Sequence, residues 1–160
     1  MNGRFAPLLE KRGTIEDPSR VIITASVAGL AIGTVGENGT YGYAASKAAV
    51  IHLGKYLAVE LGPRRILVNV IAPGFFPSKM ANELIKMTGS AEEHAAANPS
   101  RKLGRPEDLA GLVVFLSSRA SAHVNGAVIT IDGGEALGRS ATKAASAQDS
   151  KASSRFFQWV

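Results

Sequence analysis

The sequence has 160 residues, enough for one domain, and 46% of them are hydrophobic, which is enough for a core. It contains no cysteine, so disulfides and thiolate metal sites are excluded. The net charge is +5, but +3 of it comes from the stretch after Gly138, where four basic residues face one acid. No basic surface alternates with aromatic residues, so we expect no nucleic-acid partner. No apolar run has membrane-spanning length and the start lacks a signal-peptide pattern, so a cytoplasmic location is expected.

The first apolar run, from Arg20 to Thr24, is rich in β-branched residues and leads into Ala25 and Ser26. This pattern predicts a buried parallel strand whose carboxyl end opens into a loop. In open α/β sheets, ligands bind beyond the carboxyl ends of the strands. Ser26 is therefore expected to emerge at a ligand site.

Tyr43 and Lys47 lie four residues apart near the start of an expected helix from Tyr41 to Leu61. At this spacing both side chains project from one face of the helix. An ammonium held close to a phenol favours the phenolate, which makes a tyrosine usable as a general acid or base. Tyr41 is the competing tyrosine, but the residue four positions after it is Ala45. Because Tyr41 has no lysine partner, we expect it to pack in the loop.

Two more strands are expected, at residues 65–72 and 127–131, and one more helix is expected between them, at residues 106–116. The bend Pro73-Gly74 follows the first of these strands and offers bare backbone to a flat ligand. Between Ser78 and Asn98, Gly89 separates two short helical stretches. The three histidines are scattered over different elements, so no metal site is expected.

Several motifs occur in a fixed order along the chain: Ser26, Tyr43-x-x-x-Lys47, Asn69-x-x-x-Pro73-Gly74 with Ser78 four beyond the glycine, Gly104-Arg105-Pro106-Glu107-Asp108 and Asp132-Gly133-Gly134. Together they resemble the short-chain dehydrogenase/reductase family, over about residues 5 to 135. The branch that the sequence most resembles is that of the 3-oxoacyl-carrier-protein reductases, in the form of a fungal rhamnolipid-type relative. The resemblance implies an α/β fold. It would be a partial Rossmann fold, the C-terminal half of a doubly wound parallel sheet with about three strands and flanking helices.

Members of this family open with a glycine-rich phosphate loop, T-G-x-x-x-G-x-G, which is absent from this sequence. The glycines at 36, 39 and 42 precede the tyrosine helix instead of following a first strand, so we do not expect them to bind phosphate. We therefore expect residues 1–137 to form a partial dehydrogenase domain that lacks the N-terminal cofactor-binding half. Residues 138–160, rich in Ala, Ser and Lys, are expected to be a disordered tail.

The resemblance implies an oxidoreductase that uses NADP or NAD to reduce a ketone or 3-oxoacyl group, or to oxidise the alcohol. Tyr43 would protonate the developing alkoxide, Ser26 would hydrogen-bond the same oxygen, and Lys47 would hold the ribose of the cofactor. Four further residues would contact the cofactor, together with Tyr43 and Lys47: Pro73, Gly74, Phe76 and Ser78. Ser26 lies seventeen residues before Tyr43, a longer gap than is usual in the family, and the extra length falls between Gly33 and Thr40.

Two functions remain open at this point. One is a reductase represented by a chain that is inactive alone and that forms a homo-oligomer through the Tyr43–Leu61 helix. The alternative is a non-catalytic truncated homologue that dimerises with a full-length dehydrogenase or modulates it. A small carbonyl compound or alcohol is the partner expected for the first function, and a protein is the partner expected for the second.

Overall fold

The structure is a computed structural model that describes residues 5–33, 35–36, 39–78 and 89–138. Its helices are α1 (Ala6–Arg12), α2 (Tyr41–Leu61), α4 (Ala91–Ala97) and α5 (Pro106–Ser117). Its strands are β1 (Ser19–Thr24), β2 (Ile66–Pro73) and β3 (Val128–Ile131). Short 3₁₀ helices are η1 (Val27–Gly29), η3 (Gly62–Arg64) and η4 (Arg119–Ser121).

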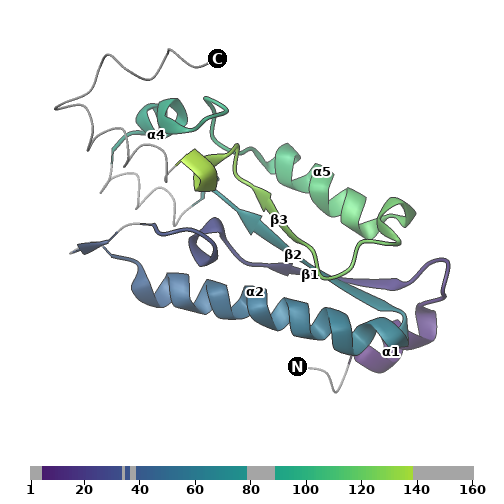
Figure 1. Ribbon diagram of the computed structural model, residues 1–160. Helices are drawn as coiled ribbons and strands as arrows, with labels where there is room; N and C mark the ends of the chain where they lie inside the picture. The colour runs from purple at the N-terminus through teal and green to yellow at the C-terminus, as the bar shows by residue number, and fades with distance from the viewer. Residues whose placement is uncertain (1–4, 34, 37–38, 79–88, 139–160) are drawn as a thin grey trace, which may run out of the picture.

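The three strands form one parallel sheet in the order β1-β2-β3. In Figure 1, α2 covers one face of this sheet and α5 covers the other. The arrowheads of the strands point to the same end of the molecule, near α4. This arrangement confirms the expected α/β fold, with three parallel strands and flanking helices.

The central strand β2 is buried from Ile66 to Ala72 because it has a neighbour on each side and a helix over each face. On one face, Ile66 and Val68 pack with Leu57 and Leu61 of α2. The helix approaches the sheet closely at Gly54, where an added Cβ would lie 2.3 Å from a methyl carbon of Val70. Glycine at this position therefore sets the distance between α2 and the sheet.

Helix α2 begins and ends where the sequence predicts. It runs from Tyr41 to Leu61, and Gly62-Pro63 then forms the start of η3. Proline cannot supply the backbone donor that a continuing helix needs, so the helix ends there. The β1-α2-β2 unit thus connects two adjacent parallel strands through one long helix.

A buried asparagine ties β2 to the segment before β3. Asn69 is 2% exposed. Its side-chain amide donates to the carbonyl of Val124 at 2.7 Å, and its side-chain oxygen accepts from the N–H of Ala127 at 3.0 Å. Asn125 acts in the reverse direction, because its oxygen accepts from the N–H of Val68 at 2.9 Å. The two asparagines together fix the position of the segment before β3 relative to β2.

The start of β1 is held by a cluster of arginines around Asp17. Arg20 Nη1 lies 2.7 Å from one carboxylate oxygen of Asp17, and Arg12 Nη2 lies 3.0 Å from the other. Hydrogen bonds from Arg20 and Arg12 lower the pKa of the Asp17 carboxyl to about 2. Asp17 therefore stays ionised at neutral pH and anchors the amino end of the strand that leads to Ser26.

Two sequence-based expectations concern residues beyond the described ranges. The first helical stretch expected after Ser78 falls on residues 79–88, which lie outside the described residues. The expected tail, residues 138–160, also lies outside them except for Gly138. The second helical stretch corresponds to α4. Within the described ranges, no helix has both the length and the apolar character needed to cross a bilayer.

Candidate active site

Ser26 lies where β1 ends. The N–H of Ala25 donates to the carbonyl of Ile71 at 2.8 Å, which carries the pairing with β2 one residue beyond the strand. Ser26 then forms the N-cap of η1, and its side-chain oxygen accepts from the N–H of Ala28 at 3.2 Å. This hydrogen bond leaves the hydroxyl proton free to be donated elsewhere.

The turn that carries Ser26 packs directly on the backbone of α2. An added Cβ at Gly29 would lie 2.6 Å from the carbonyl carbon of Lys47 and 2.7 Å from the nitrogen of Ala48. Both of these atoms belong to the backbone, so neither could move aside at low cost. Glycine at position 29 therefore lets the serine turn approach the helix beside Lys47. The sequence did not indicate this contact.

Tyr43 and Lys47 lie together on the first turns of α2, as the sequence predicts. Lys47 Nζ is 5.5 Å from the centroid of the Tyr43 ring. The same ammonium lies 3.5 Å from the carbonyl oxygen of Thr24, at the end of β1. The side chain of Tyr43 is partly open to solvent, since the residue is 39% exposed. The pair can thus be reached by a ligand, and it borders the strand end from which Ser26 emerges.

The competing tyrosine has a different role. The hydroxyl oxygen of Tyr41 accepts from the N–H of Gly36 at 2.9 Å. This bond closes the loop that precedes α2, so the expected loop-packing role of Tyr41 is confirmed. The extra length between Gly33 and Thr40 lies partly outside the described residues.

The Pro73-Gly74 bend lies at the same end of the sheet. An added Cβ on Gly74 would lie 2.6 Å from the Cβ of Asp132 and 2.8 Å from a carboxylate oxygen of Glu135. Glycine is thus required here for packing against the segment after β3, a reason that the sequence did not reveal. Ser78, four residues after Gly74, is exposed at the end of the described segment.

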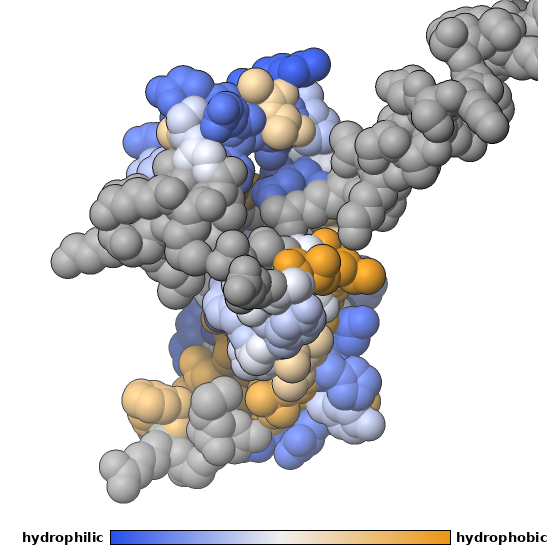
Figure 2. All heavy atoms as spheres, turned by 90° about the vertical axis from the view of Figure 1, so that its left-hand side faces the viewer, coloured by the Kyte–Doolittle hydropathy of each residue, from blue (hydrophilic) through white to orange (hydrophobic). Residues whose placement is uncertain are grey.

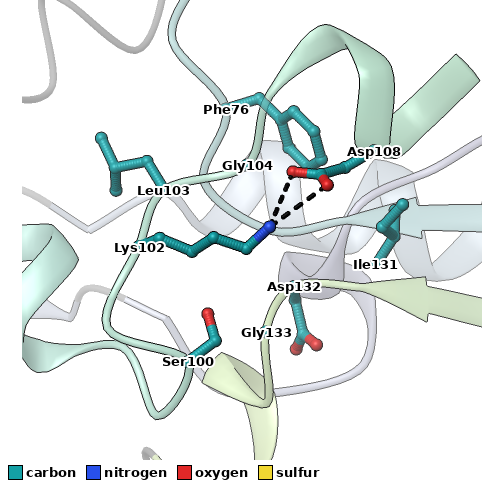
Figure 3. A pocket seen from close by; sticks show the side chains of 9 residues that line it. All are labelled: Phe76, Ser100, Lys102, Leu103, Gly104, Asp108, Ile131, Asp132 and Gly133. Carbon is teal, nitrogen blue, oxygen red and sulfur yellow. Dashed lines mark hydrogen bonds and ion pairs between the residues drawn. The ribbon is translucent and has the colours of Figure 1, made fainter.

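Phe76 lines a pocket of about 290 Å³ between the segment before α5 and the end of β3. The close view in Figure 3 shows Lys102 reaching across it to Asp108, with Nζ 3.1 Å and 3.2 Å from the two carboxylate oxygens. The backbone N–H of Arg105 and then the ammonium of Lys102 lower the pKa of the Asp108 carboxyl. Asp108 also accepts from that N–H at the start of α5, so this acid has a structural role.

A second pocket, of about 340 Å³, lies between the loop after η1 and the first turns of α2. Its lining is mostly apolar, with Ala44, Ala45 and Ala48 on the helix side. On the loop side, Ile32 is 77% exposed. Figure 2 looks at this end of the molecule and shows orange apolar surface half-way down and below, interspersed with hydrophilic surface. An apolar surface therefore lies between the loop after η1 and the face of α2 that carries Ala44, Ala45 and Ala48.

Among the described residues, no group of three or more histidine, aspartate and glutamate side chains could hold a metal ion. At the carboxyl end of β1 the structure instead places the hydroxyl of Ser26 and the ammonium of Lys47, with the phenol of Tyr43 beside that ammonium. These are hydrogen-bond donors and proton carriers suited to a carbonyl oxygen and to sugar hydroxyls.

Comparison with known proteins agrees with this geometry. Residues 4–135 match a protein family described as enoyl-(acyl carrier protein) reductase. The chain is 44% identical over 131 residues to the rhamnolipids biosynthesis 3-oxoacyl-[acyl-carrier-protein] reductase of Pseudomonas aeruginosa. The chain belongs to the short-chain dehydrogenase/reductase family. The alignment covers 82% of this chain and 50% of that relative, so the chain spans about half the length of the curated relatives it matches.

Other members of the family show the same partial coverage. The 3-oxoacyl-[acyl-carrier-protein] reductase FabG of Thermotoga maritima is 43% identical over 104 residues, which are 64% of this chain and 41% of that protein. The solved structure titled Pseudomonas aeruginosa RhlG/NADP active-site complex has a TM-score of 0.71 at 44% identity, over 82% of this chain and 52% of that chain. The rhamnolipid-type relative is therefore bacterial, and the expectation of a fungal one was wrong.

Two residues that bear on the site were missed by the sequence reasoning: Gly29 and Glu135. Gly29 follows Ser26 closely, but its contact is with Lys47, eighteen positions later. Glu135 contacts the bend after β2 from sixty positions away. No local pattern marks either residue, because its importance depends on a partner that only the fold brings near.

Proposed function

We propose that the chain carries the proton-transfer site of an NAD(P)-dependent oxidoreductase that reduces a ketone or 3-oxoacyl group, or oxidises the corresponding alcohol. The observation that carries the proposal is the placement of Lys47 Nζ 5.5 Å from the Tyr43 ring, beside the strand end that leads to Ser26. The 3-oxoacyl substrate is supported by the names of the two reductases to which the chain is 44% and 43% identical.

Tyr43, Ser26 and Lys47 have different roles in this proposal because their side chains differ in chemistry. A nicotinamide cofactor, when bound, would supply the hydride that converts the ketone to an alkoxide, and the residues of this chain would act on the alkoxide oxygen. Tyr43 donates its phenolic proton to that oxygen, and the Ser26 hydroxyl donates a hydrogen bond to it. Lys47 stabilises the phenolate that Tyr43 leaves behind and offers its remaining N–H groups to ribose hydroxyls.

The other side of the proposed nicotinamide site is the bend after β2. The backbone of Pro73 and Gly74 would line the nicotinamide ring, Phe76 would lie beyond it, and the Ser78 hydroxyl would hydrogen-bond the carboxamide. The apolar surface around Ile32, beside α2, suits the acyl chain of a 3-oxoacyl substrate. The three polar groups, the glycine bend and the apolar surface fit a nicotinamide cofactor and an acyl substrate.

The 160-residue chain alone is expected to bind a reduced nicotinamide only weakly. In folds of this kind, much of the affinity comes from a pyrophosphate seated on a glycine-rich loop and a helix N-terminus, and this sequence contains no such motif. Titration of NADPH fluorescence with the chain should show no saturation below about 100 μM. Saturable binding in the low micromolar range would contradict the expectation that affinity depends on groups outside these residues.

A matched pair of lysine variants tests whether any binding that is seen uses the proposed site. Lys47→Met removes the ammonium beside Tyr43, whereas Lys55→Met removes an exposed ammonium two turns further along α2. The first variant is expected to weaken binding, and the second to leave it unchanged. Equal effects of the two variants on binding would mean that the cofactor does not bind beside Lys47.

A second candidate function is that of a partner protein for other dehydrogenase chains. On the outer face of α2, Leu53 is 46%, Tyr56 65% and Val59 79% exposed. Side chains of this size on one long helix favour burial against another helix. We propose that two chains pair through α2, either two copies of this chain or this chain and a full-length relative.

Size-exclusion chromatography with light scattering tests this pairing. The chain should elute as a dimer alone, or together with the Pseudomonas aeruginosa reductase when the two are mixed, and Val59→Glu should abolish both species. Ile15→Glu, at an 82% exposed position in a loop, is the control and should change neither. A wild-type chain that stays monomeric in both experiments would exclude the interaction role.

A further inference from the structure

The backbone that follows β2 is held by residues distant in the sequence. The N–H of Gly74 donates to the carbonyl of Ile131 at 3.1 Å, at the end of β3. The N–H of Phe75 donates to a carboxylate oxygen of Glu135 at 3.2 Å. The carbonyl of Phe75 accepts from the N–H of Gly104 at 3.0 Å. Both polar groups of the Phe75 backbone are thus satisfied from outside the bend.

Glu135 contacts the bend directly. The same carboxylate oxygen that accepts from Phe75 would lie 2.8 Å from a Cβ built on Gly74. The carboxylate therefore fills the space beside Gly74 that a side chain would occupy. A displacement of Glu135 would empty this space and leave the N–H of Phe75 without its acceptor. Glu135 itself is only half-buried, so water could replace its oxygen if the side chain were shortened.

The position of Glu135 is fixed by Asp132. One carboxylate oxygen of Asp132 accepts from the N–H of Gly134 at 3.0 Å, and the other accepts from the N–H of Ala136 at 2.8 Å. Asn98 donates from its side chain to the carbonyl of Asp132 at 2.8 Å. The turn after β3 is therefore held in one shape, and Glu135 projects from it toward the bend.

The aromatic ring of Phe75 is held separately from its backbone. It stacks on the ring of His94 in α4, with centroids 4.8 Å apart and planes within 10°. The stacking restrains the side chain of Phe75, whereas the hydrogen bond of its backbone N–H is made to Glu135. Loss of the Glu135 carboxylate should therefore change the backbone at residues 74–75 without freeing the ring.

We infer that Glu135 is a positioning residue whose carboxylate fixes the backbone of the Pro73-Gly74-Phe75 bend. Its value to a nicotinamide site rests on the proposed function, because the bend forms one wall of that site. The fixing of the bend does not depend on the proposed function. A hydrogen bond to a charged acceptor is stronger than one between neutral groups, so a carboxylate suits this role better than an amide.

Amide hydrogen exchange followed by nuclear magnetic resonance tests the inference. In Glu135→Ala, the exchange of the Phe75 amide should rise about tenfold or more relative to the wild type. Glu135→Gln keeps an acceptor oxygen and should restore most of the protection. Glu107→Ala, at an exposed acid in the first turn of α5, should leave the Phe75 amide unchanged. Unchanged Phe75 exchange in a folded Glu135→Ala protein would overturn the inference.

A second measurement separates this inference from the proposed function. NADPH affinity is measured for the wild type and Glu135→Ala in the protein as its source produces it, with circular dichroism to confirm that both are folded. Affinity should fall about tenfold in Glu135→Ala and recover in Glu135→Gln. If the wild type binds no NADPH, the proposed function fails, whereas a raised Phe75 exchange still supports the positioning role. If affinity stays unchanged although Phe75 exchange rises, Glu135 does not position this site.

Discussion

Replacing Tyr43 with phenylalanine is expected to lower kcat/KM for reduction of a 3-oxoacyl thioester by about 10²–10⁴-fold. The change removes one hydroxyl and keeps the ring on which the Lys47 ammonium lies, 5.5 Å from the centroid. The developing alkoxide then loses the phenol that would protonate it. The assay follows NADPH consumption by the protein as its source produces it.

Tyr41→Phe is the matched control for this variant. It removes the same group two residues earlier, where the hydroxyl accepts a hydrogen bond from the N–H of Gly36. We expect turnover to stay within about threefold of the wild type, because Tyr41 has no lysine partner. Equal losses in the two variants would mean that the loop before α2, and not proton transfer, limits the reaction.

Replacing Asn69 with leucine is expected to lower the free energy of unfolding by about 2–4 kcal/mol. Leucine has the same number and branching of side-chain heavy atoms but leaves the carbonyl of Val124 and the N–H of Ala127 without their partner. The loss should be seen as a lower midpoint in urea with an unchanged slope.

The control for Asn69 is Thr130→Ala, at an exposed position on the neighbouring strand β3. This change removes a polar side chain without orphaning a buried backbone group, so the midpoint should shift little. A leucine variant as stable as the wild type would show that water replaces both hydrogen bonds. The role assigned to Asn69 in fixing β3 would then be wrong.

Much of the fold follows from local patterns in the sequence. The apolar run from Val21 to Ile23 has β-branched side chains on both faces, and it forms a strand in the sheet. Helix α2 ends at Leu61 because Gly62-Pro63 cannot continue it. The spacing of Tyr43 and Lys47 on that helix likewise follows from the helical period, so this pair was predictable from the sequence alone.

The rest of the site depends on contacts between distant segments. Gly29, Asn69 and Glu135 matter because of partners eighteen to sixty residues away, and no periodicity encodes such pairs. The sequence analysis identified Asn69 only as part of a motif that resembles the family. Its structural reason, two hydrogen bonds to the segment before β3, becomes visible only in the fold. Sequence patterns thus locate the reactive groups, and tertiary contacts explain what holds them in place.

The central claim is that Ser26, Tyr43 and Lys47 form the proton-transfer site of a nicotinamide-dependent carbonyl reduction. Its most direct test uses NADPH carrying deuterium at the hydride-donating carbon and a 3-oxoacyl thioester, with the native protein purified from its source. The intact mass of that protein is recorded against the 16.7 kDa of this chain, so that the tested species is known. We predict a 3-hydroxyacyl product with deuterium on the former carbonyl carbon. With NADPH labelled at both hydrogens of that carbon and with folded protein, the absence of deuterium transfer to every thioester and ketone tried would contradict the account.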